Sequence, residues 1–215
     1  MWSVSTILAG VTALFWLVNL KSFPTFWHFR FYNSLFKHLY FYKPSKAVAS
    51  DVFHTRVYTT RSPAMECDLN LHKSNSTYFS DLDIARTDLI AGLFHKWIND
   101  VKRKENRWPY VALAGVVSLF RREIKPYSKF NIKSRVIGWD EKWIFVLSRF
   151  ETPKGKLIAT CVSKYVFKLG RKTVPPKDVL DHCGMWNDEV ENKGNDGRKR
   201  VQGIIDLDQL DEVDF

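Results

Sequence analysis

The sequence predicts an α+β fold in which one long helix packs against an antiparallel sheet. Between Ser76 and Lys104, apolar residues recur at offsets of three and four, the period of a helix with one buried face. Four stretches with strand character follow this segment and one precedes it. Because no other long helix is expected beside the sheet, this one must cover the apolar face of the sheet.

Residues 1–21 are predicted to form a membrane anchor. Residues 1–20 carry no charged side chain, and a helix of that length spans about 30 Å, the thickness of a bilayer core. A cleavable signal peptide is the alternative, but the run is long for a signal core and lacks an initial cation. Cations follow the segment, so the positive-inside rule predicts a single-pass protein with its domain in the cytosol. The endoplasmic reticulum is the expected membrane.

Residues 22–45 are predicted to be an aromatic amphipathic helix at the membrane interface. Large rings crowd the stretch between Ser22 and Tyr42, interspersed with cations such as Arg30 and Lys37. This composition suits a helix whose rings lie at the acyl boundary and whose cations lie near anionic lipid. The alternative is that the rings cap the globular core.

Residues 46–185 are predicted to form the globular domain. Pro109 ends the long helix, and in the strand 129–137 the residues Phe130, Ile132 and Val136 fall on one face. The expected strands are 51–60, 110–122, 129–137, 142–150 and 156–168, and a short helix runs from Pro175 through Asp181.

Residues 186–215 are predicted to be a polar linker and an acidic tail. Gly194, Gly197 and Gly203 indicate flexibility in 187–203. The last twelve residues carry acidic side chains and no cation, so they are interpreted as disordered, or as an amphipathic segment that docks on the basic domain.

Charge and cysteine content restrict the classes of function. The chain has 33 Lys and Arg against 23 Asp and Glu, a formal charge of +10, which suits anionic partners such as a membrane surface, a CoA phosphate or nucleic acid. Nucleic-acid binding rests on charge alone and is not expected. Three cysteines at no repeated spacing favour neither disulfides nor a metal site, and no cofactor is expected. No phosphate-binding glycine loop or serine-hydrolase elbow is present.

A motif before the long helix carries the functional prediction. Across Glu66–Tyr78, Asp68 is followed by His72 after four residues, then by Asn75 and Tyr78. This resembles the hotdog-fold thioesterase superfamily, whose motif has an acid, an Asp, a His, an Asn pair and a Tyr at the same offsets. Residues 135–145 look like a strand-turn-strand of its membrane-anchored eukaryotic branch, thioesterase superfamily member six, and the likeness covers roughly residues 50–183.

The resemblance implies a hotdog fold, in which a curved antiparallel sheet wraps a long central helix. It also implies a homodimer that hydrolyses acyl-CoA, with Asp68 aligned to the catalytic carboxylate of bacterial hydroxybenzoyl-CoA thioesterases. The sequence departs from the family motif at two positions, since Glu66 replaces an Asp and Ser74 replaces the first Asn.

Thioester hydrolysis needs a carboxylate that attacks the carbonyl or activates water, and donors that polarise the carbonyl oxygen. Asp68 is the candidate base or nucleophile. Orienting and substrate-binding roles are assigned to His72, Asn75, Ser76, Thr77 and Tyr78, and CoA phosphate contacts to Arg121 and Arg122.

Each assignment has a structural alternative. Asp68 fits an ordinary loop acid, His72 a structural histidine and Tyr78 a core residue. Asn75 and Ser76 fit helix N-caps, and Glu66 is expected to be solvated. Basic strand residues such as Arg121 and Arg122 fit a solvated face equally well. At the level of function, the alternative to a membrane-anchored thioesterase acting on fatty acyl thioesters is a non-catalytic module. Such a module would bind acyl-CoA or lipid, or act as a membrane scaffold.

Overall fold

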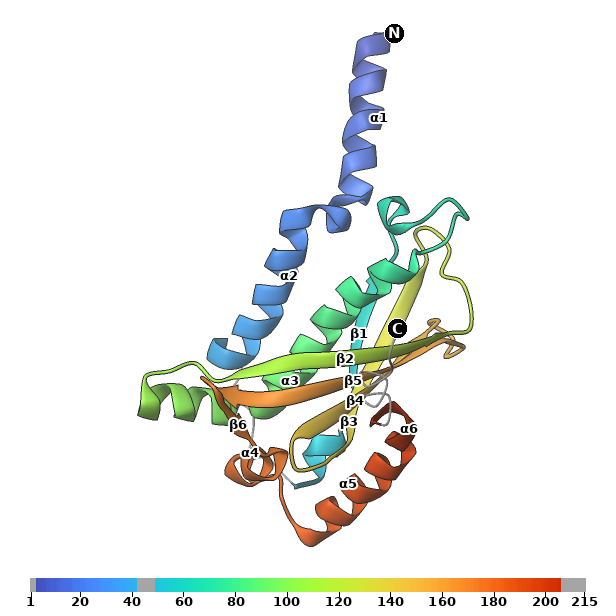
Figure 1. The fold of residues 1–215 in the computed structure, drawn as a ribbon. Coiled ribbons are helices and arrows are strands. Elements are labelled where there is room, and N and C mark those ends of the chain that lie inside the picture. Colours follow the sequence, from blue (N-terminus) through green and yellow to red (C-terminus); the bar gives the residue numbers. More distant parts are fainter. Residues whose placement is uncertain (1–2, 42–48, 206–215) are drawn as a thin grey trace, which may run out of the picture.

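A computed structural model describes residues 3–41 and 49–205 of the chain (Figure 1). The helices are α1 (Val4–Val18), α2 (Pro24–Phe36), α3 (Asn75–Glu105), α4 (Pro176–Cys183), α5 (Asp188–Arg200) and α6 (Gln202–Ile205). The strands are β1 (Arg56–Arg61), β2 (Tyr110–Phe120), β3 (Lys129–Trp139), β4 (Trp143–Glu151), β5 (Leu157–Leu169) and β6 (Lys172–Val174).

All strands belong to one antiparallel sheet. Its order is β1-β3-β4-β5-β2, and the short β6 pairs with β5. The strand that precedes the helix therefore lies at one edge, in the register Tyr58↔Ile132. The first strand after the helix lies at the opposite edge, paired with β5. The predicted helix and the four strands that follow it are confirmed within a few residues at their ends.

The strand predicted at residues 51–60 begins later than expected. Residues Ala49–Phe53 form a 3₁₀ helix, closed by a hydrogen bond from the His54 amide to the Asp51 carbonyl at 3.0 Å. Extended pairing starts only at Arg56, where β3 supplies a partner.

The long helix α3 covers the inner face of the sheet, as the sequence predicts. Tyr78 and Leu82 on its first turns pack with Phe130 of β3 and Phe150 of β4. Further along, Phe94 meets Phe167 of β5 edge to face, with ring centroids 4.9 Å apart. Burial along β3 alternates, with Phe130, Ile132, Ser134 and Val136 buried.

The predicted membrane anchor is wrong. Among the described residues, no helix combines the length and the apolar character needed to cross a bilayer. Helix α1 has 15 residues, so at about 1.5 Å per residue it reaches about 22 Å rather than the required 30 Å or so. Its C-cap is Asn19, whose side chain donates to the Phe15 carbonyl and accepts from the Met65 amide at 3.0 Å. The expected single-pass topology and endoplasmic reticulum location depended on this anchor, so these two predictions are wrong as well.

The aromatic segment after α1 packs on the domain along one of its faces. Helix α2 lies beside α3 (Figure 1), and the residues after it are tied to α3 by the buried His38, whose Nε2 lies 2.7 Å from Asp88. On the other face, the rings of Phe29 and Tyr32 are 66% and 50% exposed. The interpretation of rings that cap the domain thus holds for one side of α2.

The predicted linker at 187–203 is instead largely helical. The Asn187 side chain caps α5 by accepting from the Val190 amide at 2.8 Å, and acidic residues occupy its first turn and basic residues its last. Gly194 and Gly197, taken from sequence as flexible, face β3: a Cβ on Gly194 would lie 2.6 Å from the Trp139 ring, and one on Gly197 would clash with the Ile137 carbonyl. Their missing side chains allow α5 to approach the outer face of the sheet. The predicted acidic tail lies almost wholly outside the described residues.

We expect Gly197→Ala to destabilise the docking of α5, because the added methyl group meets backbone rather than a movable side chain. Overpacking of this kind costs about 1–3 kcal/mol. The matched control is Gly203→Ala, where a Cβ meets no atom within 4 Å. Urea denaturation and amide hydrogen exchange across 188–200 would measure the difference; equal stability of the two variants would contradict the close packing.

Candidate active site

The motif forms a tight loop that leads directly into α3. Cys67 and Lys73 form an isolated antiparallel bridge, and the Asp68 amide donates to the His72 carbonyl at 3.0 Å. Leu71 takes a left-handed conformation with φ of 58°, which allows the chain to reverse within a few residues. The loop is thereby held as a hairpin whose base is next to the helix start.

Asp68 and His72 lie at the open side of this hairpin. The Asp68 carboxylate accepts from the Asn70 amide at 2.9 Å, and its Oδ1 lies 3.7 Å from Nδ1 of His72. Both side chains are partly exposed, at 35% and 24%. The predicted pair is therefore brought together, with its carboxylate partly open to solvent.

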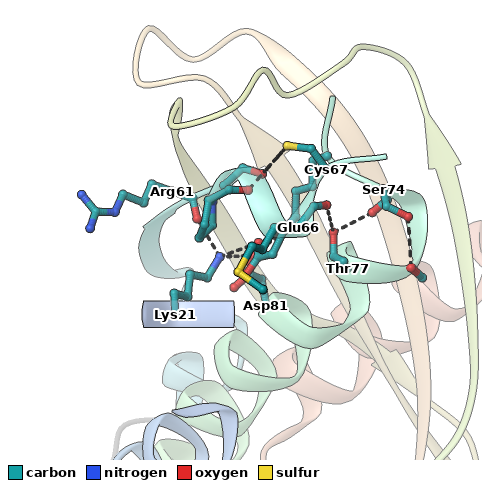
Figure 2. A network of polar contacts seen from close by, with 12 residues as sticks. Lys21, Arg61, Glu66, Cys67, Ser74, Thr77 and Asp81 are labelled. Carbon is teal, nitrogen blue, oxygen red and sulfur yellow. Dashed lines mark hydrogen bonds and ion pairs between the residues drawn. The ribbon is translucent and has the colours of Figure 1, made fainter. Parts of the chain in front are cut away.

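The first turn of α3 presents backbone donors beside the hairpin. The Ser74 amide and the Thr77 hydroxyl both bind the Glu66 carbonyl, at 2.9 and 3.0 Å (Figure 2), so the loop is clamped to the helix start. The Thr77 amide donates to the Ser74 carbonyl at 2.9 Å. This leaves the amides of Asn75 and Ser76 as the first-turn groups with no acceptor inside the helix. Both residues are exposed.

The N-cap predicted at Asn75 or Ser76 lies earlier in the chain. The N-cap position is Ser74, and its side chain makes no capping hydrogen bond; its hydroxyl lies 3.1 Å from that of Ser76. Asn75 is the first helical residue, so its side chain is not needed to cap α3.

Tyr78 belongs to the core rather than to the open site. It is 2% exposed and packs against Phe120 and Phe150, each with centroids 5.0 Å away. Burial raises the pKa of its phenol to about 12. The structure therefore favours the core interpretation over the substrate contact assigned to this residue.

Arg121 and Arg122 lie in the loop that follows β2. This loop reaches the motif, since the Lys73 amide donates to the Ile124 carbonyl at 2.8 Å. Both arginines are exposed, and the Arg122 guanidinium donates to the Leu157 carbonyl at 2.5 Å. The two cations thus border the motif loop without entering the hairpin.

A buried charge cluster lies beneath the hairpin, and the sequence did not indicate it. It consists of Lys21, Arg30, Lys73, Glu66 and Asp81. Asp81 is 1% exposed and accepts from Lys21 at 2.7 Å, Arg30 at 2.8 Å and Lys73 at 3.0 Å. Glu66, expected to be solvated, is buried and accepts from Lys21 at 2.9 Å and Lys73 at 2.5 Å.

The cluster joins three separate segments of the chain. Figure 2 shows Lys21, just after α1, reaching Glu66, Asp81 and the Arg61 carbonyl, the last at 2.6 Å. Arg30, expected to lie near lipid, instead binds Asp81 and the Tyr58 hydroxyl, the latter at 2.8 Å. Only the folded chain brings these residues together, because Lys21 and Asp81 stand 60 positions apart.

The cluster shifts the protonation of its members. Burial alone would raise the pKa of Asp81, but Lys21, Lys73 and Arg30 together hold it below its ordinary value. Desolvation lowers the pKa of Lys21 against the opposing pull of Asp81. Three cations face two carboxylates, so the base of the hairpin carries excess positive charge.

The comparisons agree with this geometry. A model of the thioesterase-like superfamily matches residues 62–183. A probable thioesterase of Saccharomyces cerevisiae is 38% identical over 208 residues, covering 91% of this chain and 88% of that protein. Protein THEM6 of Xenopus laevis is 24% identical over 138 residues, 63% of this chain and 62% of that protein. The crystal structure of YbaW, a probable thioesterase from Escherichia coli, aligns with a TM-score of 0.51 and 14% identity, covering 60% of this chain and 96% of that one.

A long helix against an antiparallel sheet is the hotdog fold of the aligned structure, and the family model and the similar proteins place this chain in the class of thioester hydrolases. The chain belongs to the thioesterase-like superfamily. The fold and family predicted from the motif are confirmed, and so is the reaction class.

Proposed function

We propose that the substrates are fatty acyl-CoA thioesters and that Asp68 is the catalytic carboxylate. The observation that carries this proposal is the clamp between loop and helix. Because Ser74 and Thr77 bind the Glu66 carbonyl, the hairpin that carries the partly exposed Asp68 carboxylate is fixed to the start of α3, where the first amides have no acceptor inside the helix. Thioester hydrolysis needs this combination of a base and preorganised donors.

In the proposed reaction, the thioester oxygen lies against the amides of Asn75 and Ser76. These donors and the positive end of the α3 dipole stabilise the oxyanion that forms on attack. Asp68 either removes a proton from the attacking water or attacks the carbonyl carbon itself. The C–S bond then breaks and the CoA thiolate leaves. If Asp68 acts as the base, it passes the proton taken from water to the thiolate and the fatty acid is released directly. If Asp68 acts as the nucleophile, water hydrolyses the mixed anhydride formed on it, which releases the fatty acid, restores the carboxylate and supplies the proton for the thiolate.

His72 is proposed as an orienting group for Asp68. At 3.7 Å between Nδ1 and Oδ1, a small movement brings the ring within hydrogen-bond distance of the carboxylate. The Asn75 side chain is exposed and does not cap the helix, and we propose that it contacts the water or the thioester.

Arg121 and Arg122 are proposed to meet the phosphates of CoA. Both lie on the exposed loop hydrogen-bonded to Lys73, and arginine pairs well with phosphate. Arg122 is partly engaged by the Leu157 carbonyl, so Arg121 is the better placed of the two.

We further propose that the chain acts as a homodimer. The outer edge of β2 has no strand partner among the described residues, which is a surface suited to pairing with a second copy. At the hairpin tip, Leu69 is 100% exposed and Leu71 is 75% exposed. A second copy of the chain could bury this apolar surface in the dimer.

The test of this function is release of free CoA from a series of acyl-CoA substrates by purified protein. We expect turnover that rises from short to long acyl chains, measured with a thiol reagent. Hydrolysis confined to short or aromatic acyl groups would overturn the fatty acyl assignment, and absence of hydrolysis at any length would overturn the CoA thioester assignment.

A further inference from the structure

We propose that the acyl chain lies in an apolar cavity between α2, α3 and β2, so that the N-terminal helix α2 helps set the chain length that is accepted. This inference rests on the proposed function, because it takes the thioester to be held at the start of α3. It assigns a ligand to a cavity and a role to an N-terminal segment that the reaction itself does not use.

The cavity is large enough for a long hydrocarbon chain. Its volume is about 680 Å³, within the range of roughly 300–1,000 Å³ that is typical of small-molecule sites. Phe31, Leu35 and Phe36 of α2 form one wall, with Thr87 of α3 and Leu113 of β2 opposite.

Residues of α3 that line the cavity share a helix face with Ser76 of the first turn. Ser76, Phe79, Asp83 and Thr87 follow one another at offsets of three and four, so they share a helix face that leads from the first turn to the cavity lining. At about 1.5 Å per residue, Asp83 lies about 10 Å along the axis from Ser76. The lining continues to Ile98, about 22 Å beyond Asp83.

The chemistry of the lining favours a hydrocarbon over a polar group. Asp83 is the one charged side chain among the described residues that line the cavity, and it is paired with Arg86. It lies at the end nearest the start of α3, while the remote end is formed by Ile98, Trp108 and Pro109. An acyl chain extending away from the thioester would therefore meet apolar walls along most of its length.

One wall of this cavity is formed by α2, which lies outside the part of the chain that matches the family model. The family match begins at residue 62, whereas α2 ends at Phe36. The helix is held in place by Arg30 on Asp81 and by His38 on Asp88. Its rings therefore form a fixed wall, and the size of that wall limits the space left for the chain.

The test compares a variant that fills the cavity with one that opens it. Thr87→Phe adds a ring to the half-buried face of α3 that lines the cavity. Burial of one methylene group strengthens binding about fourfold. If the added ring displaces two methylene groups of the palmitoyl chain from the cavity, the ratio of kcat/KM for palmitoyl-CoA to that for butyryl-CoA should fall by roughly tenfold or more. Phe36→Ala removes part of the α2 wall and should shift the preference toward chains longer than palmitoyl.

Two controls accompany these variants. Thr87→Val keeps the branched shape and adds no volume, so its substrate ratio should match that of the unaltered protein. Phe29→Ala removes an exposed ring of α2 that does not line the cavity, and should leave the chain-length profile unchanged. An unchanged profile in both Thr87→Phe and Phe36→Ala would overturn the inference, as would a Thr87→Phe effect limited to oligomeric state in sedimentation.

Binding of the fluorescent fatty acid cis-parinarate separates this inference from the proposed function. We expect Thr87→Phe to weaken its binding at least tenfold and Thr87→Val to leave it unchanged. If parinarate binds in this pattern but no acyl-CoA is hydrolysed, the proposed function fails and the cavity assignment stands. If acyl-CoA is hydrolysed but parinarate binds all variants equally, the cavity assignment fails alone.

Discussion

Replacing Asp68 with Asn is expected to lower kcat for acyl-CoA hydrolysis by at least about 100-fold, the usual contribution of a positioned general base. The substitution is suited to the loop, because an Asn side-chain oxygen can still accept from the Asn70 amide, which lies 2.9 Å from Oδ1 of Asp68. The hairpin and the fold are therefore preserved while the basic and nucleophilic character is lost. Steady-state kinetics with palmitoyl-CoA, together with thermal unfolding, would measure both properties.

Asp140 provides a matched control for Asp68. It caps the turn between β3 and β4, where its Oδ1 accepts from the amides of Lys142 and Trp143 at 2.8 and 2.6 Å. Asp140→Asn thus repeats the same chemical change in another backbone-capping aspartate, and should leave kcat unchanged. If Asp68→Asn retains activity within threefold of the unaltered protein, the carboxylate does not act in the reaction.

The helix and strands of the domain were predictable because their signals are local. The period of the apolar residues in Ser76–Lys104 and the alternation in β3 reflect one buried face each, and such patterns can be read along the sequence. The offset of four between Asp68 and His72 likewise reflected a local hairpin. The roles of these two residues in catalysis stay predictions.

The predictions that were wrong concern residues whose surroundings depend on partners far away in the sequence. Gly194 and Gly197 suit a flexible linker as well as a helix pressed against a strand, and only β3 distinguishes the two. Lys21 and Arg30 suit a lipid surface as well as a buried carboxylate, and only Asp81 reveals which applies. The apolar run before Lys21 was long enough in sequence, but the helix ends at Val18.

Replacing Asp81 with Ala is expected to cause a large loss of stability, about 3–5 kcal/mol, as when one partner of a buried ion pair is removed. Lys21 and Lys73 would then share only Glu66 as an anionic partner, and Arg30 would lose the carboxylate that it binds. The matched control is Asp100→Ala on the same helix. Its carboxylate is 27% exposed and pairs with His182 and Arg103, so its loss should cost less than about 1 kcal/mol. Urea denaturation gives both values.

The pH dependence provides a second readout of the same carboxylate. Because the surrounding cations lower the pKa of Asp81 in the folded state, its contribution is fully present above the unfolded value of about 3.9. That contribution is lost as pH falls through the folded pKa. The unaltered protein should therefore lose stability more steeply below about pH 4 than Asp81→Asn does. Parallel curves for the two proteins would contradict an ionised Asp81.

A double-mutant cycle distinguishes charge imbalance from a simple loss of packing. Lys21→Met removes the cation that lies 2.7 Å from Asp81 and keeps most of the side-chain length. In the Asp81→Asn background this change should restore part of the lost stability, because it removes one of the three buried cations that then face Glu66 as their remaining cluster carboxylate. Additive losses in the cycle would mean that Lys21 and Asp81 contribute independently. Recovery in the double variant would instead show that this pair links the segment after α1 to the start of α3, directly beneath the Asp68 hairpin.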